Sequence, residues 1–362
     1  MNEVKAAKHL GQHFLRDEAV IARLLAVINA QAGERILEIG PGLGALTLPL
    51  LRQTGTLTAV EYDPRVLAPL AKKAAPLGTL HLIHADILDI HFDELLAAES
   101  PHSPADMPPP LRSGGGLGRG CENSAQAADS LPPPVEEGWG GVHPHTAAAE
   151  SPTDMPPPPQ NDTPLPPWGR GRGWGLPAHP VVESGNDQPA ATTEAPQKLR
   201  LVGNLPYNLS SPILFHCLAQ RQHIHDMHYM LQKEVVDRIT AAPGSKTYGR
   251  LSLMAQLWCE TTALFDIPPD AFDPPPKVDS AVVRLVPRPA PAWQIDDLAT
   301  FEETVRLAFA QRRKMLRKTF AHWMSAAALE ALDIDPTARA ETLDGAAFAR
   351  LANARYQQER QQ

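Results

Sequence analysis

The feature that most constrains the fold is a short apolar strand that runs directly into a glycine turn. Residues 35–39 read as a buried strand, and Gly40-Pro41-Gly42-Leu43-Gly44 follows at once. Glycine allows a sharp turn and lets a ligand approach the backbone without a Cβ atom in the way. A helix is expected from Leu43 to Leu51. Strand, glycine turn and helix together are typical of the first unit of a nucleotide-binding α/β sheet.

Strands and helices alternate along the rest of this part of the chain. Helices are expected at residues 19–28 and 66–74, and further strands at residues 57–61, 80–84 and 199–202. Such alternation predicts an α/β fold with a parallel, doubly wound sheet.

A glycine or a polar residue stands at the end of each of four expected strands. These residues are Gly40, Glu61, Asp86 and Asn204. Ligands of doubly wound sheets bind at the carboxyl ends of the strands, so the four are expected to line one site. Glu61 lies 21 positions after Gly40, close to the spacing of about 20 for an acid that binds a ribose. Asp86 either accepts from the amino group of a cofactor adenine or caps its own loop.

The glycine turn by itself does not choose between NAD and S-adenosylmethionine, but Asn204-Leu205-Pro206-Tyr207 favours the second. The lone pair of an adenine N6 is delocalised into the ring. The side-chain carbonyl of Asn204 and a neighbouring backbone carbonyl can both accept from N6 and direct its lone pair toward a methyl group. Tyr207 offers a ring on which the base can stack. The alternative is an ordinary Asn-Pro turn after a strand.

Residues 99–197 differ in composition from the rest. They hold 21 of the 38 prolines and 13 of the 24 glycines, and they include Met155-Pro156-Pro157-Pro158-Pro159. Such a low-complexity Pro/Gly-rich insert is expected to be disordered, and the alternative is a proline-rich docking arm. The insert carries the formal charge of −8, which leaves 29 acidic and 29 basic residues elsewhere. The net charge therefore does not exclude a partner that binds a local basic patch.

Cellular location and metal content are also constrained. No run of about 18 apolar residues predicts a membrane span, and the N-terminus lacks the apolar stretch of a secretory signal. Cys121, Cys217 and Cys259 form no close pair, which fits a reducing cytosol. His223, His225, Asp226 and His228 are grouped in the sequence but are not expected to converge on a metal, so no metal site is predicted.

The combination of motifs resembles the family of 16S ribosomal RNA adenine N6,N6-dimethyltransferases over nearly everything outside the insert. The segments that carry the resemblance are Gly11-Gln12-His13-Phe14-Leu15, Glu38 to Gly44, Val202 to Asn208, Leu231 to Val235, Tyr248 to Ser252, Phe272 to Ser280 and Gln311 to Lys314. The insert is the departure from the family pattern.

The resemblance implies a Rossmann-like methyltransferase domain that uses S-adenosylmethionine as methyl donor, without a metal. In that reading, His13, Leu15, Gly40, Glu61, Asp86 and Asn204 line the cofactor pocket. The target adenine is held by Asn204, Leu205 and Tyr207, with Phe272 as a second stacking face on a loop that three prolines stiffen and expose.

The expected domain boundaries follow from the same reading. Residues 1–98 and 198–288 form the methyltransferase domain, and residues 289–362 form a smaller helical domain that binds RNA. Residues 304–320 contain six basic side chains and no acid, which favours phosphate contacts, although a solvated helix face is the alternative.

The expected reaction is dimethylation of two adjacent adenines near the 3′ end of 16S ribosomal RNA. The partner is the small ribosomal subunit or its precursor, and the protein is expected to be a cytoplasmic monomer. Two alternatives remain open: a dimethyltransferase that acts on large-subunit RNA, and a ribosome-assembly factor whose methylation is secondary. The basic stretch and Tyr248 to Ser252 favour the small subunit.

Overall fold

A computed structural model describes residues 6, 12–98 and 197–361. These residues belong to one unit that comprises residues 1–100 and 182–362. The predicted insert, residues 99–197, lies outside the described residues apart from Gln197, so its predicted disorder remains a prediction.

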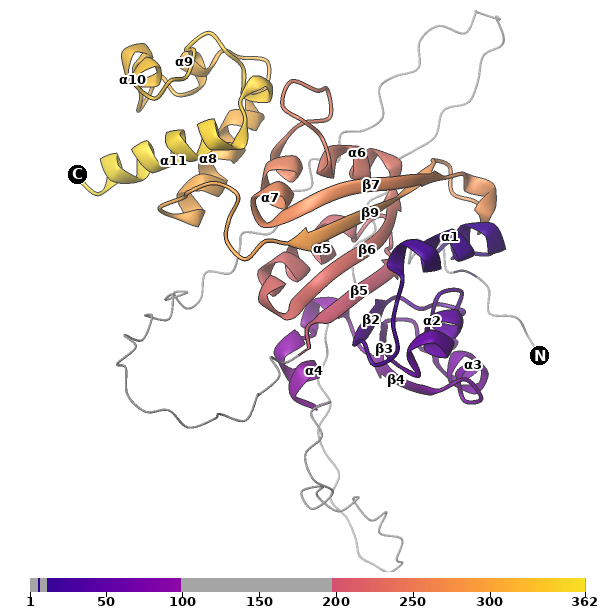
Figure 1. Cartoon of the computed structure of the whole chain (residues 1–362). Coiled ribbons are helices and arrows are strands. Elements are labelled where there is room, and N and C mark those ends of the chain that lie inside the picture. The colour runs from indigo at the N-terminus through magenta and orange to yellow at the C-terminus, as the bar shows by residue number, and fades with distance from the viewer. Residues whose placement is uncertain (1–5, 7–11, 99–196, 362) are drawn as a thin grey trace, which may run out of the picture. The chain divides into compact units, whose positions relative to one another are not determined.

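Seven strands of the described residues form one sheet in the order β4-β3-β2-β5-β6-β9-β7 (Figure 1). Strands β2 to β6 run parallel, and β9 pairs antiparallel with β6 and β7. Their bounds are β2 Ile36–Ile39, β3 Thr56–Glu61, β4 Thr79–His84, β5 Leu199–Asn204, β6 Ile224–Gln232, β7 Cys259–Ile267 and β9 Ser280–Pro287. The chain moves outward from β2 to β4 and returns to β5 beside β2. This reversal is the point at which doubly wound sheets bind ligands.

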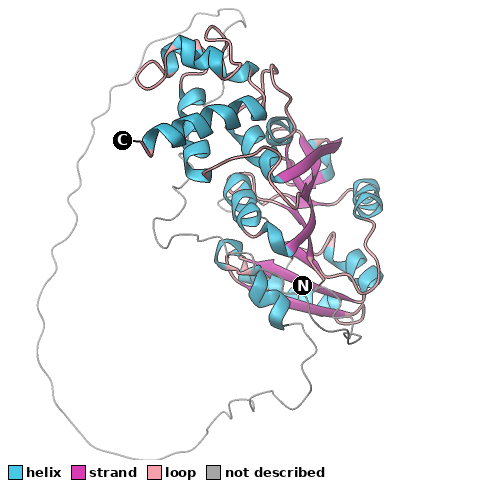
Figure 2. Ribbon diagram, turned by 60° about the vertical axis from the view of Figure 1, so that its left-hand side comes forward, coloured by secondary structure: helices cyan, strands magenta, loops and turns pink. Residues whose placement is uncertain are grey.

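Helices lie on both sides of the sheet (Figure 2). Their bounds are α1 Glu18–Ile28, α2 Thr47–Thr54, α3 Pro64–Ala74, α4 Phe92–Ala98, α5 Ser210–Ala219, α6 Lys233–Ile239 and α7 Arg250–Trp258. The doubly wound α/β prediction is confirmed. Helix α2 begins later than expected because Gly44 has a φ of +92°, which a regular helix does not allow.

The chain becomes helical after the last strand, as expected. Strand β9 ends at Pro287, and the helices that follow are α8 Leu298–Ala310, α9 Leu316–Thr319, α10 Ala326–Ala331 and α11 Gly345–Glu359. The stretch 304–320 is not one helix, because α8 ends at Ala310 and a turn separates it from α9. The domain boundary near residue 289 remains a prediction.

A buried ion-pair cluster ties α1 to the sheet. Arg200 donates to both carboxylate oxygens of Asp226 at 2.9 Å, to Glu34 at 2.6 Å and to the carbonyl of Ile28 at 2.7 Å. The carbonyl groups at the end of α1 thereby gain a cationic donor, which helix C-termini favour. Both carboxylate oxygens of Asp226 accept hydrogen bonds from Arg200, so the role of this carboxylate is structural.

Two short strands join distant parts of the chain. Strand β1, Phe14–Leu15, pairs antiparallel with β8, Phe272–Asp273. The pairing holds the N-terminal segment, defined here as residues 12–16, beside the carboxyl ends of the sheet strands.

Candidate functional site

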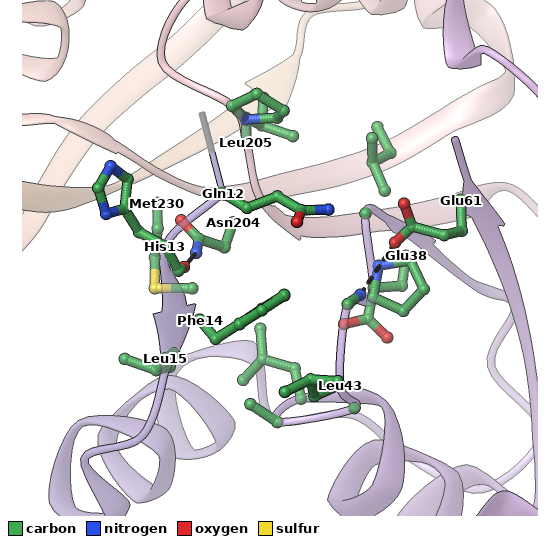
Figure 3. A pocket seen from close by; sticks show the side chains of 18 of the residues that line it. Gln12, His13, Phe14, Leu15, Glu38, Leu43, Glu61, Asn204, Leu205 and Met230 are labelled. Carbon is green, nitrogen blue, oxygen red and sulfur yellow. Dashed lines mark hydrogen bonds between the residues drawn. The ribbon is translucent and has the colours of Figure 1, made fainter. Parts of the chain in front are cut away.

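The four residues at the strand ends line one cavity of about 850 Å³. Figure 3 labels two of them, Glu61 and Asn204, with the N-terminal residues Gln12 to Leu15 nearby. Gly40 follows β2, Glu61 ends β3, Asp86 follows β4 and Asn204 ends β5. The predicted convergence at the carboxyl edge of the sheet is confirmed. The cavity is also lined by His13, Leu15, Leu205 and Tyr207, each of which the sequence assigned to the site.

The glycine turn has a backbone that requires glycine. Gly40, Gly42 and Gly44 have φ values of +68°, +52° and +92°. A side chain at Gly42 would also meet the ring of Phe14, 3.1 Å from the position of its Cβ atom. The turn therefore brings bare backbone to the cavity wall.

Glu61 is a buried carboxylate that organises this turn. Its Oε2 accepts from the backbone N–H of Gly42 at 3.0 Å (Figure 3), and its Oε1 accepts from that of Asp63 at 2.8 Å. Burial raises the pKa of Glu61, and the two backbone donors oppose part of the rise. A role as ribose acceptor remains a prediction, because each oxygen already accepts one bond from the chain.

Asp86 is at once a loop cap and part of the cavity wall. Its Oδ1 accepts from the backbone N–H of Leu88 at 2.9 Å, which caps the short helical turn Ile87–Asp89. Capping uses one carboxylate oxygen. A contact with a cofactor adenine remains a prediction.

Glu38 also lines the cavity, although no separate role was predicted for it. It is 2% exposed, and its Oε2 accepts no hydrogen bond from the described residues. Burial raises its pKa to about 7, with an opposing effect of the Thr47 hydroxyl and a small further rise from Glu61. The position of Glu38 within an otherwise apolar strand is the sequence feature that could have indicated a role in the site.

The segment Asn204 to Tyr207 forms the wall between β5 and α5. The side-chain Nδ2 of Asn204 donates to the carbonyl of His13 at 2.8 Å. Leu205 is buried, and its backbone N–H donates to the carbonyl of Met230. The hydroxyl of Tyr207 and the Oγ of Ser280 share a hydrogen bond of 2.6 Å, and burial raises the pKa of Tyr207.

Phe272 is buried, so the expectation of an exposed aromatic is wrong. The side chain is 3% exposed, does not line the cavity and belongs to the apolar cluster that includes Leu15 and Val282. Burial of a phenylalanine is worth about 1.5–3 kcal/mol, which outweighs any exposure that the following prolines favour. In this structure the ring that faces Tyr207 is the imidazole of His13, at 5.5 Å between centroids and 25° between planes.

The N-terminal segment is fixed at both ends. Gln12 donates to Asp63 at 2.9 Å, and Arg16 pairs with Asp273 at 2.6 Å. Arg65 and Gln12 lower the pKa of Asp63 to about 2. Gln12, Phe14 and Leu15 all line the cavity, so this segment closes one side of the site.

The basic residues at 304–320 divide into two groups. Arg306 pairs with Glu303 and Arg312 with Glu341, each at 2.7 Å, so the lack of acids within the stretch does not leave these two free for phosphate contacts. The pairing of Arg312 with Glu341 could not be predicted from neighbouring residues, because Glu341 lies 29 positions further along the chain. Among the described residues, no carboxylate forms an ion pair with the other four basic side chains, although Arg317 acts on Asp335: hydrogen bonds from Thr337 and, to a smaller extent, the charge of Arg317 lower the pKa of Asp335. These four residues are called the basic surface group: Arg313, Lys314, Arg317 and Lys318.

The described residues contain no group of three or more His, Cys, Asp or Glu side chains that could hold a metal ion. In residues 6, 12–98 and 197–361, no helix is both long enough and apolar enough to cross a membrane.

Comparison with known sequences gives a consistent group of relatives. The model of the family described as ribosomal RNA adenine dimethylase matches residues 3–124 and 169–357. A ribosomal RNA small subunit methyltransferase A from Dichelobacter nodosus is 46% identical over 99% of both chains. One from Xanthomonas euvesicatoria pv. vesicatoria is 41% identical over 96% of this chain and 95% of that protein.

Two solved structures share the fold. A dimethyladenosine transferase from Plasmodium falciparum has a TM-score of 0.57 at 17% identity and covers 96% of this chain and 98% of its own. The 23S rRNA methyltransferase ErmE has a TM-score of 0.55 at 19% identity, with coverage of 94% and 98%. At these identities the likeness concerns the fold alone.

Proposed function

Because the chain belongs to the ribosomal RNA adenine dimethylase family, we propose that it dimethylates N6 of two adjacent adenines near the 3′ end of 16S ribosomal RNA. The protein is an rRNA adenine methyltransferase, and the exact adenines are the part proposed here. The observation that carries the proposal is the meeting of the glycine turn, Glu61 and Asn204–Tyr207 at one cavity.

The proposed methyl donor is S-adenosylmethionine, and the cavity fits its chemistry. Oε2 of Glu38, which has no hydrogen-bond partner in the described part of the chain, is a buried acceptor suited to a cationic group, since an opposite charge nearby favours the ionised carboxylate. The glycine turn leaves room for a nucleoside, while Glu61 and Asp86 supply acceptors for hydroxyl and amino groups. Bound there, the donor supplies an electrophilic methyl group on a sulfonium sulfur.

The chain's own residues orient the nucleophile. Oδ1 of Asn204 and the carbonyl of Leu205 are proposed to accept from N6 of the target adenine, which holds its lone pair toward the donor. Tyr207 supports the base by stacking, worth about 1–3 kcal/mol in comparable contacts. Its hydroxyl is anchored to Ser280, so the ring does not have to be ordered when the base arrives. Orientation of two reactants is the main contribution expected of such a site.

The basic surface group is the proposed phosphate-binding surface. Its four side chains are exposed and, among the described residues, have no ion-pair partner, whereas Arg312 also donates to the carbonyls of Ser245 and Lys246. Arg312 therefore joins the 245–246 loop to Glu341, and its proposed role is structural.

The relatives favour small-subunit RNA over large-subunit RNA as the substrate. The small-subunit name of the relatives at 46% and 41% identity favours 16S over 23S RNA, while the likeness to ErmE concerns the fold only. A role in small-subunit assembly, a cytoplasmic location and a monomeric state are further parts of the proposal.

The test is incubation of purified small and large subunits with the enzyme and labelled S-adenosylmethionine, followed by mass spectrometry of the RNA. We expect dimethyladenosine in small-subunit RNA only, and none with Asn204→Ala, because that variant removes the proposed acceptor. Label in large-subunit RNA would support the competing substrate. Assembly restored in cells by Asn204→Ala would make methylation secondary.

A further inference from the structure

We propose that the backbone carbonyl of His13 positions the catalytic amide. It holds the side chain of Asn204 so that Oδ1, and not Nδ2, is presented to the target adenine. The inference rests on the proposed function and adds a positioning group from a segment 191 residues away in the sequence.

The contact itself dictates the orientation of the amide. Nδ2 of Asn204 lies 2.8 Å from the carbonyl oxygen of His13 (Figure 3). A carbonyl oxygen can only accept, so a flipped amide would bring two acceptors together at that distance. Within the described residues, Oδ1 of Asn204 has no hydrogen-bond partner. Its acceptor capacity therefore remains available for N6.

An amide without such a partner could present either end to the base. With Nδ2 forward, a donor would face the N6–H groups of adenine, which are also donors. The carbonyl of His13 removes that unproductive state before the base arrives. This is preorganisation, and it lowers the cost of orienting the reactants.

The carbonyl can act in this way because His13 is held from several sides. Its Nδ1 lies 2.7 Å from the carbonyl of Pro274, which can only accept, so Nδ1 carries the hydrogen. The imidazole stacks on Tyr207. The next two residues form β1 and pair with Phe272 and Asp273. The buried Phe272 thus supports the site through the backbone of the N-terminal segment.

The first test uses Asn204→Asp, which keeps an acceptor for N6 and loses the donor to His13. Single-turnover rates are measured on small subunits at saturating S-adenosylmethionine, and each rate is divided by that of the wild type at the same pH. We expect a loss of roughly 100-fold at pH 8, as for a misplaced catalytic group. The ratio should rise at least tenfold toward pH 5.5, because a protonated carboxyl group can again donate to the carbonyl of His13.

Division by the wild-type rate removes the titration of Glu38 and Glu61, the buried carboxylates that both proteins share in the cavity. Asn204→Ala, which lacks both the acceptor and the donor, is the matched control, and its rate should stay below detection at every pH from 5.5 to 8. A rate for Asn204→Asp within threefold of the wild type at pH 8 would overturn the inference, and so would a ratio that does not rise on acidification.

The second test does not depend on a substitution at Asn204. Deletion of residues 1–13 removes the carbonyl, and deletion of residues 1–11 keeps it. At saturating cofactor, kcat of the longer deletion should be at least tenfold lower than that of the shorter one, and a smaller difference would overturn the inference. Absence of N6 methylation by the wild type would instead count against the proposed function, so the two failures are distinguishable.

Discussion

Replacement of Glu38 by glutamine should change how the stability of the protein depends on pH. Glu38 is 2% exposed, its Oε2 has no partner among the described residues, and burial raises its pKa from 4.5 to about 7. The folded protein therefore binds this proton more tightly than the unfolded chain does. Glutamine keeps the size and shape of the protonated acid and cannot ionise.

The sign follows from linkage. Because the folded-state pKa is raised, the stabilisation is present below pH 4.5 and is lost as pH rises from about 4.5 to about 7. A difference of roughly 2.5 units corresponds to about 3 kcal/mol at 1.36 kcal/mol per unit. Relative to the wild type, Glu38→Gln should gain about that much stability between pH 4.5 and pH 8.

Urea denaturation of both proteins from pH 4.5 to pH 8 measures the effect. Glu330→Gln is the matched control, because it makes the same chemical change at an exposed position in α10. A stability difference between Glu38→Gln and the wild type that stays constant over this range would refute the reasoning, since it would mean that Glu38 does not take up a proton in the folded state.

Three further predictions concern the cofactor, the insert and the RNA surface. Glu61→Ala should weaken the binding of S-adenosylmethionine by on the order of 1.5–3 kcal/mol, since it removes a charged acceptor and the hydrogen bond to the backbone N–H of Gly42. Unchanged affinity in calorimetry would place the ribose elsewhere. Joining Ala98 to Lys198 should leave a folded, active enzyme. The carbonyl of Leu96 and the backbone N–H of Arg200 both bond to Arg35, and the five residue steps that would then connect Leu96 to Arg200 span up to about 17 Å. An intact fold without methylation would make the insert part of substrate recognition. Changing the four residues of the basic surface group to Gln should lower the slope of log affinity for small subunits against log salt by roughly 3–4. The single change Arg312→Gln should instead lower the melting temperature and leave that slope unchanged. Equal slopes for both variants would argue against this division.

The local pattern of the sequence was sufficient for the framework of the site. Alternation of strands and helices, the glycine turn and the polar residues at strand ends each depend on a few neighbouring residues, and they placed Gly40, Glu61, Asp86 and Asn204 at one cavity. Parallel strands end at the same edge of a sheet, so their order in the chain is enough to predict the meeting.

Tertiary packing decided which side chains are buried and which have partners. Phe272 is buried against Leu15 rather than exposed, and Arg312 is paired with Glu341 rather than free for RNA. The contact between Asn204 and His13 likewise joins residues far apart in the chain. Burial and hydrogen bonding depend on neighbours in space, and no period of two or of 3.6 residues encodes neighbours that lie 29 to 257 positions apart.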